Sequence, residues 1–310
     1  MTEAVSLNKR VSVVIPLYNH ENYIEQALES VITQSAKPLE IIVVDDGSGD
    51  ASADKVRHAA ARCPELVYWS QPNQGAHKAI NAGVHRAQGE IVAILNSDDA
   101  FHPQRLEECL HVLDELPDVS VVATGLEFMD DSGRSIPNSW YERAKAFFEK
   151  EGDLSLALVN GNFIMTTSNL VIRRSVFEEI GYFSALRYAH DLDFMLRLVV
   201  RDKNFHLLDK ALINYRMHAT NTISEDVIKV KTEWAAVVAY FIYSHGRNKT
   251  RAERDWEYYG RLTGITDNHR LTAYILHFLK YFDSLPPCEL TCDAYMRDSE
   301  FCRFLATVIE

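Results

Sequence analysis

The first 125 residues alternate between β-branched runs and amphipathic segments, and this alternation constrains the fold more than any other feature. Runs that suit strands occupy residues 11–17, 39–46, 65–71, 91–96 and 119–125. Between them, apolar residues recur at helical spacing over 21–34, 51–62, 74–87 and 103–116. Strands that are apolar on both faces and alternate with helices predict a mostly parallel sheet sandwiched by helices, an α/β fold.

The pattern is less regular after residue 125. It predicts a turn at 130–134, short strands over 169–174, 205–208 and 211–217, and helices over 140–150, 153–160, 175–181 and 191–201. From about residue 225 onward it is helical and rich in aromatic residues. We expect a catalytic sheet domain over residues 1–224 and a helical region over 225–310, which packs on that domain or carries an acceptor or oligomer surface.

Polar residues follow each of the first four strands. Sheets of this class bind ligands at the carboxyl ends of their strands, so these residues are the first candidates for a site. The stretches that follow the strands are Tyr18–Asn19, Asp45–Ser48, Pro72–Gly75 and Asn96–Asp99. The sequence therefore predicts that the functional chemistry lies at one edge of the sheet.

Asp98 and Asp99 are adjacent carboxylates that directly follow a buried strand. Neighbouring strand residues point to opposite faces, so one can contact a hydroxyl while the other binds a cation. A divalent metal bound by oxygen would remove their repulsion and bridge to phosphate groups. The alternative is a polar turn whose side chains satisfy local backbone groups. Asp45 has the same ambiguity, between reading a base or ribose and capping the next helix.

Several function classes are excluded or disfavoured by the sequence. It contains neither a Gly-x-Gly-x-x-Gly nor a Walker motif after a strand, and no Gly-x-Ser-x-Gly elbow. The net charge of −12 disfavours a nucleic-acid binder. Five cysteines at irregular spacing, no signal-like N-terminus and no run of about 18 apolar residues favour a cytoplasmic protein. Peripheral association with the inner face of a membrane and homo-oligomerisation stay open.

Seven stretches in order resemble the inverting glycosyltransferases of family 2, which have the GT-A fold. They span residues 11–224. Each stretch alone is weak evidence for the family, but seven stretches in the family's order make a specific match. The matching stretches are VSVVIPLYN, EIIVVDDGSGD, PNQGAHKAINAGV, GEIVAILNSDD, RRSVFEEIGYF, AHDLDFMLRL and YRMHATNTIS. The resemblance implies an enzyme that moves a hexose from a nucleotide sugar to an acceptor hydroxyl in polysaccharide or glycoconjugate biosynthesis. UDP is the expected nucleotide because it is common in the family.

The resemblance also implies roles for residues that bind the nucleotide sugar. Pro16 and Tyr18 would border the nucleotide pocket, and Asp45 would hydrogen-bond the nucleobase. Lys78 would lie near the nucleotide. Arg216 is a candidate contact of the diphosphate, with a surface cation as the equal alternative.

The same resemblance implies a divalent metal, Mn²⁺ or Mg²⁺. Asp98 would contact the ribose or sugar, and Asp99 would bind the metal. Asn96 stands where many relatives carry the first Asp of an Asp-x-Asp motif, so the metal would depend on Asp99. His218 is a second candidate ligand of the metal or diphosphate, and an imidazole would favour Mn²⁺.

Asp191 is the implied catalytic base, because its stretch AHDLDF matches the family position of Glu-Asp, with His190 in place of Glu. An inverting transfer needs one carboxylate that removes the proton of the acceptor hydroxyl. The alternative is an Asp that merely favours a helix N-terminus. Asp193 is either a supporting residue or a solvated helix carboxylate.

Two rival functions stay open beside this one. A nucleotidyltransferase also uses carboxylates at strand ends and a metal, but it would want a basic, Gly-rich loop where this chain has LYNHENY. A non-catalytic, nucleotide-binding GT-A module would not need the acidic residues and His218 together. The expected partners are a nucleotide-sugar donor and a glycan or lipid-linked glycan acceptor.

Overall fold

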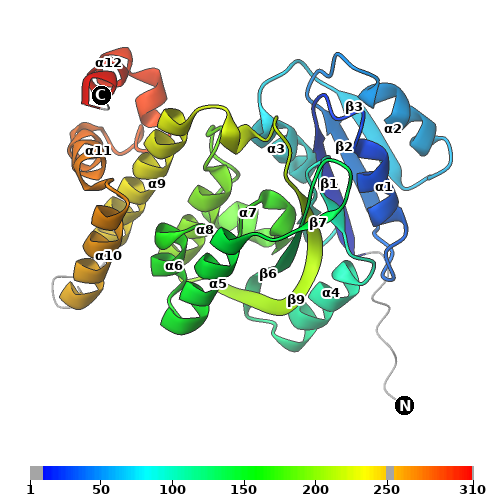
Figure 1. Ribbon diagram of the computed structural model, residues 1–310, viewed down its shortest axis with the longest axis horizontal. Coiled ribbons are helices and arrows are strands. Elements are labelled where there is room, and N and C mark those ends of the chain that lie inside the picture. Colours follow the sequence, from blue (N-terminus) through cyan, green and yellow to red (C-terminus); the bar gives the residue numbers. More distant parts are fainter. Residues whose placement is uncertain (1–9, 249–254, 309–310) are drawn as a thin grey trace. The chain divides into compact units, whose positions relative to one another are not determined.

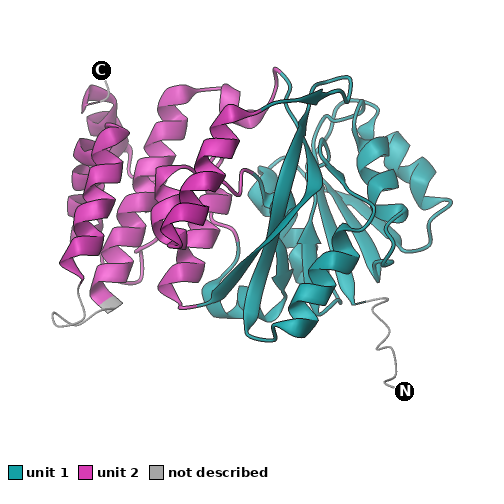
Figure 2. Ribbon diagram, turned by 60° about the horizontal axis from the view of Figure 1, so that its bottom comes forward, with its two compact units in different colours: residues 1–137, 166–182, 203–218 teal, residues 138–165, 183–202, 219–310 magenta. Residues whose placement is uncertain are grey.

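The computed structural model describes residues 10–248 and 255–308 and divides the chain into two compact units (Figure 2). The first unit comprises residues 1–137, 166–182 and 203–218, and the second comprises 138–165, 183–202 and 219–310. This division differs from the predicted boundary after residue 224, because two earlier segments, 138–165 and 183–202, pack with the C-terminal helices. The functional roles expected of the two parts of the chain remain predictions.

The first unit contains a nine-stranded mixed sheet, shown in Figure 1. Strands β1 (Val11–Leu17), β2 (Glu40–Asp45), β3 (Leu66–Ser70) and β4 (Ile91–Ile94) pair in parallel in the order β3-β2-β1-β4. Strand β8 (Val171–Arg173) joins β4 antiparallel, followed by β6 (Val119–Met129), β9 (Asn204–Arg216) and β5 (Ala100–Phe101), while β7 (Ser135–Ile136) pairs with β6. This architecture confirms the predicted α/β fold class.

Helices cover both faces of the parallel strands. Helices α1 (Ile24–Ile32) and α2 (Ser52–Ala60) lie on one face, and α3 (Ala76–Arg86) lies on the other (Figure 1). Helix α4 (Arg105–Glu115) packs against β6, and α7 (Ser175–Ile180) follows β8. All residues of β1 and β2 are buried, which explains why both strands are apolar on both faces.

Strand β9 is one continuous strand, whereas the sequence predicts two short strands separated at Asp209 and Lys210. The β6–β9 register moves from Thr124↔Leu208 to Gly125↔Ala211, so these two polar residues bulge out without ending the strand. The two-residue strands β5 and β7 were not predicted, because a pair of residues carries no readable alternation.

The second unit is helical throughout its regular structure. Its helices are α5 (Ser139–Glu151), α6 (Leu154–Asn160), α8 (His190–Val200), α9 (Val227–Asn248), α10 (Trp256–Asn268), α11 (Thr272–Ser284) and α12 (Ser299–Val308). Helix α9 packs against α8 and α11, and its core includes the buried rings of Phe241, Phe278 and Phe282. Many of the C-terminal aromatic residues therefore form core. No described helix is both long enough and apolar enough to cross a membrane.

Gly83 permits the close approach of α3 to β1. A Cβ atom at Gly83 would lie 2.4 Å from Cγ1 of Val14, inside a well-packed layer. We expect Gly83→Ala to lower the free energy of unfolding of the first unit by about 1–3 kcal/mol through overpacking. Thermal unfolding measures the change. Gly264→Ala in α10 is the matched control, because no heavy atom lies within 4 Å of its added Cβ and alanine favours a helix. Equal effects of the two substitutions would contradict the packing argument.

Candidate active site

The strand register brings the predicted polar loops of the first unit to one edge of the sheet. Leu17 lies opposite Asp45 where β1 and β2 end, and Val14 pairs with Ile94 at the end of β4. Two loop contacts tie these ends together. The backbone N–H of Gly49 donates to Asn19 Oδ1 at 2.8 Å, and His20 Nδ1 lies 2.8 Å from Ser97 Oγ.

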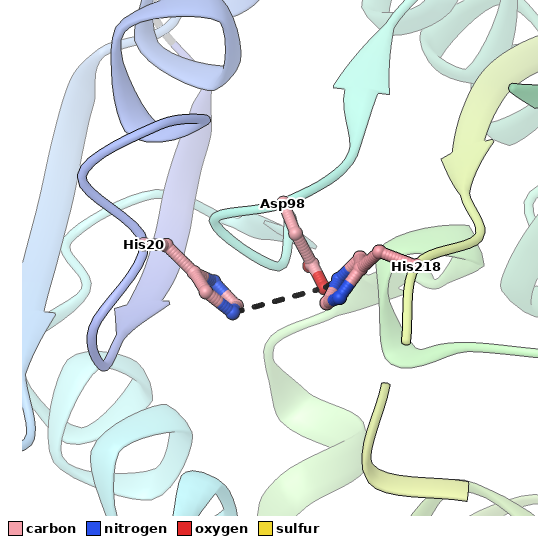
Figure 3. A group of neighbouring side chains, drawn as sticks. All are labelled: His20, Asp98 and His218. Carbon is pink, nitrogen blue, oxygen red and sulfur yellow. Dashed lines mark hydrogen bonds and ion pairs between the residues drawn. The ribbon is translucent and has the colours of Figure 1, made fainter. Parts of the chain in front are cut away.

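Three side chains converge at this edge: His20 after β1, Asp98 after β4 and His218 after β9 (Figure 3). Asp98 Oδ2 accepts a hydrogen bond from His218 Nε2 at 3.0 Å, and His20 Nε2 lies 4.0 Å from the same oxygen. One ligand atom from each residue lies within 4.8 Å of the other two. We call these three residues the His–Asp–His cluster.

The electrostatics at Asp98 and at His20 favour the protonation states that bind a cation. Burial raises the pKa of Asp98, but the hydrogen bond from His218 and the nearby His20 lower it more, so the net pKa lies below its ordinary value. Burial lowers the pKa of His20, and this effect exceeds the opposing attraction of Asp98. A carboxylate and a neutral imidazole are the forms that can bind a metal ion.

The donor set of the cluster fits a divalent transition metal. Two imidazole nitrogens and one carboxylate oxygen suit Mn²⁺ better than Mg²⁺, which prefers oxygen ligands in a near-ideal octahedron. Three protein ligands also leave coordination positions for other groups. His218, a predicted metal ligand, supplies one of these three donors, and Asp98 supplies another.

Asp99, the predicted metal ligand, lies outside the cluster and is 2% exposed. Its Oδ2 accepts from Ser168 Oγ at 2.6 Å, and its Oδ1 accepts from the backbone N–H of Arg216 at 2.9 Å. Burial, followed by repulsion from Asp98, raises the pKa of Asp99 well above its ordinary value. These hydrogen bonds join the loop after β4 to the end of β9 and to Ser168.

Asn96 also forms hydrogen bonds with the segment before β8. Its Nδ2 donates to Thr166 Oγ1 at 2.9 Å, its Oδ1 accepts from Thr167 Oγ1 at 3.0 Å, and its backbone N–H donates to Ser168 Oγ at 2.9 Å. An amide can donate and accept in this way, whereas a carboxylate cannot donate. The residue type at 96 therefore suits its hydrogen-bond partners.

Asp45 is the last residue of β2, Asp46 follows it, and both are 2% exposed. Asp45 Oδ1 accepts from the backbone N–H of Ser48 at 2.9 Å, and Tyr68 Oη donates to Asp45 Oδ2 at 3.2 Å. Asp46 accepts from the backbone N–H groups of Gln74 and Gly75, at 3.0 and 2.7 Å, and thereby fixes the loop before α3. Both carboxylates therefore hold loops at this edge of the sheet.

The remaining predicted nucleotide residues differ in exposure. Pro16 is buried in β1, and Tyr18, two residues further, is 47% exposed at the same edge. Lys78 is exposed in the first turn of α3. These positions leave Tyr18 and Lys78 accessible to a ligand and make Pro16 part of the strand that supports them.

Arg216 is buried, 2% exposed, and so is not the surface cation of the alternative prediction. Its guanidinium donates to the backbone oxygens of Asp98, Asp130 and Asp131 at 2.9 to 3.1 Å. It also lies over the ring of Tyr23, 4.7 Å from the centroid. These contacts show Arg216 fixing the loop that carries Asp98.

Asp191 belongs to the second unit, in the first turn of α8, and is 7% exposed. Asn162 Nδ2 donates to Asp191 Oδ2 at 2.9 Å, and the backbone N–H of Leu192 donates to Asp191 Oδ1 at 2.7 Å. Asn162 Oδ1 is buried and has no hydrogen-bond partner among the described residues. The carboxylate is therefore held at a helix N-terminus, where a negative charge is favoured.

Asp193 does not have the solvated position that one alternative allows. It is 1% exposed and forms an ion pair with Arg197 at 2.8 Å, while Ser184 Oγ donates to it at 2.6 Å. These contacts lie within the core of the second unit.

His20 was not among the predicted site residues, although a usable signal was present. It follows the first strand as Asp45 and Asp98 follow theirs, so the strand-end rule could have found it. Thr166 and Ser168, which bind Asn96 and Asp99, carry no such signal. They come from a segment about 70 residues away that the sequence predicts only as the approach to a strand.

The family model and the relatives that match this chain all describe glycosyltransferases. Residues 12–181 match the family model described as glycosyl transferase family 2. An uncharacterised glycosyltransferase of Nostoc is 31% identical over 216 residues, which cover 68% of this chain and 66% of the relative. An uncharacterised glycosyltransferase of Rickettsia typhi is 29% identical over 239 residues, covering 73% and 70%.

Solved structures with a similar fold include TarS and PcManGT. TarS 1–349 of S. aureus, in complex with UDP-GlcNAc, superposes with a TM-score of 0.59 at 19% identity, covering 96% of this chain and 90% of that one. The mannosyltransferase PcManGT of Pyrobaculum calidifontis, in complex with GDP-Man and Mn²⁺, gives 0.57 at 19% identity, covering 96% and 84%.

Proposed function

The chain belongs to glycosyltransferase family 2 and has the GT-A fold, and we propose that it is a metal-dependent, inverting enzyme that uses a nucleotide diphosphate sugar. The His–Asp–His cluster is the observation that carries this proposal. It lies at the carboxyl ends of parallel strands, where such sheets bind nucleotides. Its mixed nitrogen and oxygen donors also suit a metal ion that accompanies a diphosphate.

In this proposal, Asp98, His218 and His20 hold the metal, and Asp99 binds the backbone of Arg216, whose guanidinium donates to the backbone oxygen of Asp98. This assignment replaces Asp99 as the metal ligand, because the two carboxylate oxygens of Asp99 accept hydrogen bonds from Ser168 Oγ and from the backbone N–H of Arg216. A divalent ion bound there would stabilise the negative charge of the departing diphosphate. Tyr18, Lys78 and Asp45 remain proposed contacts of the nucleotide.

Asp191 is the proposed base. Its carboxylate removes the proton of the acceptor hydroxyl, whose oxygen forms a bond to the anomeric carbon of the sugar. The bond from that carbon to the diphosphate breaks, and its electron pair leaves with the nucleoside diphosphate. Attack from the face opposite the leaving group inverts the anomeric configuration, as expected for a single displacement.

The proposed acceptor is a hydroxyl of a glycan or lipid-linked glycan, in polysaccharide or glycoconjugate biosynthesis. A UDP-sugar is the first candidate donor. The structure of TarS contains UDP-GlcNAc and that of PcManGT contains GDP-Man, so both nucleotides occur among proteins of similar fold. The assignment of the donor to this chain is a proposal that binding measurements can test.

A thermal-shift panel of UDP-, GDP- and dTDP-sugars, each with Mn²⁺ or with EDTA, tests the donor. A ligand that binds only the native state at 100 times its dissociation constant stabilises it by about 2.7 kcal/mol. We expect one nucleotide to raise the unfolding temperature strongly, and to do so only with Mn²⁺. His218→Ala is the paired variant, and it should remove the Mn²⁺-dependent part of the shift. Equal shifts in Mn²⁺ and EDTA would contradict metal-dependent donor binding.

A further inference from the structure

Glu233 is a buried carboxylate of α9 that binds the segment leading into α8. It is 3% exposed. Its Oε1 accepts from the backbone N–H of Arg187 at 2.9 Å, and its Oε2 accepts from those of Tyr188 and Ala189 at 2.6 and 3.0 Å. The backbone N–H groups of three consecutive residues therefore donate to one carboxylate, which lies more than 40 residues further along the chain.

This arrangement offsets part of the cost of burying Glu233, whose pKa still lies above its ordinary value. Burial raises the pKa of Glu233, and the three N–H donors, together with nearby His190, act against that rise. A carboxylate can accept all three hydrogen bonds, whereas an amide must turn a donor toward one of the N–H groups. Hydrogen bonds to a charged acceptor are also roughly twice as strong as neutral ones.

The segment held by Glu233 ends directly at α8. Ala189 precedes His190, the first residue of that helix, and Asp191 follows in the first turn. Fixing the three amides fixes the path by which the chain enters α8, and with it the direction of the Asp191 side chain. Asn162 contacts the carboxylate itself, whereas Glu233 contacts only the backbone before it.

We propose that Glu233 is a positioning residue for Asp191, and this inference rests on Asp191 being the base of the proposed function. Glu233 lies in the part of the chain, 225–310, that the sequence predicts to pack on the sheet domain or to carry an acceptor or oligomer surface. The helical C-terminal region therefore contributes to catalysis by orienting the base. A displacement of a reacting group by about 1 Å costs on the order of 10²-fold in rate.

The test compares Glu233→Gln with Glu225→Gln. Glu225 is the matched control, because it also binds the 187–189 segment but through the exposed side chain of Arg187, whose side chain is 56% exposed. The readout is the hydrolysis of UDP-GlcNAc and of GDP-mannose with Mn²⁺, in which water takes the place of the acceptor. Calorimetry with UDP or GDP and Mn²⁺ gives the affinity and the number of intact sites.

We expect Glu233→Gln to lower turnover roughly 10²-fold, with the nucleotide affinity within about twofold and the number of sites unchanged. Amide exchange at residues 187–189 should quicken in this variant. Glu225→Gln should keep turnover within about twofold. Because the donor contacts are independent of Glu233, the loss appears in kcat and not in the donor KM.

The outcomes separate this inference from the proposed function. Wild-type turnover by Glu233→Gln, beside an inactive Asp191→Asn, would overturn the role of Glu233 and leave the base in place. A loss of turnover matched by an equal loss of nucleotide sites would mark a general loss of folded protein and would also overturn it. Wild-type turnover by Asp191→Asn would instead remove Asp191, and Glu233 with it, from the mechanism.

Discussion

Asp191→Asn is expected to lower the rate of sugar transfer by about 10²–10⁴-fold, the usual contribution of a general base. The amide keeps the shape of the side chain but cannot take the proton of the acceptor hydroxyl. In Asp191→Asn the amide oxygen can still accept from the backbone N–H of Leu192, and the amide nitrogen can donate to Asn162 Oδ1, which has no partner among the described residues, once the Asn162 amide rotates. The fold and the donor affinity should therefore change little.

The measurement is initial-rate kinetics with the donor found by the thermal-shift panel, together with calorimetry of the nucleotide and Mn²⁺. Asp283→Asn is the control, because Asp283 is an exposed carboxylate of another helix, α11. We expect the control to keep wild-type kcat. Equal kcat values for Asp191→Asn and the wild type would exclude Asp191 as the base, and a product of retained anomeric configuration would exclude single displacement.

The regular part of the fold follows from local patterns in the sequence. Strands β1 to β4 are mostly apolar and are followed by polar residues, and α1 to α4 carry apolar residues at helical spacing, so each is predicted to within a few residues. Strand β9 is harder to predict from the sequence, because the polar pair Asp209–Lys210 resembles a turn between two strands. Only its pairing with β6 shows that this pair is a bulge.

The candidate site was predictable by region but less so by residue. The strand-end rule pointed to Asp98 and Asp99, and the family resemblance added His218. It could not distinguish Asp98 from Asp99, because the difference depends on Ser168 and the Arg216 amide, which come from distant segments. Glu233 is similar, because its binding partners are backbone groups, and these have no signature in the sequence.

Asp98→Asn is expected to abolish the Mn²⁺-dependent increment in nucleotide affinity, whereas Asp99→Asn is expected to preserve it. Asp98 contributes the carboxylate of the His–Asp–His cluster, and a neutral amide is a poor ligand for a divalent cation beside a diphosphate. Loss of one ligand or of its close support typically costs 10–100-fold in affinity or activity, and this range is roughly what we expect for Asp98→Asn.

Asp99→Asn should instead lower stability. Its Oδ atoms accept hydrogen bonds from Ser168 and from the Arg216 amide, and an amide at this buried position would leave one donor without an acceptor. The expected cost is about 1–3 kcal/mol in the free energy of unfolding. Calorimetry in Mn²⁺ and in EDTA, with thermal unfolding of both variants, measures the two effects separately. If Asp99→Asn lost the Mn²⁺ increment and Asp98→Asn kept it, the metal would belong to Asp99, and the His–Asp–His cluster would lose its proposed role.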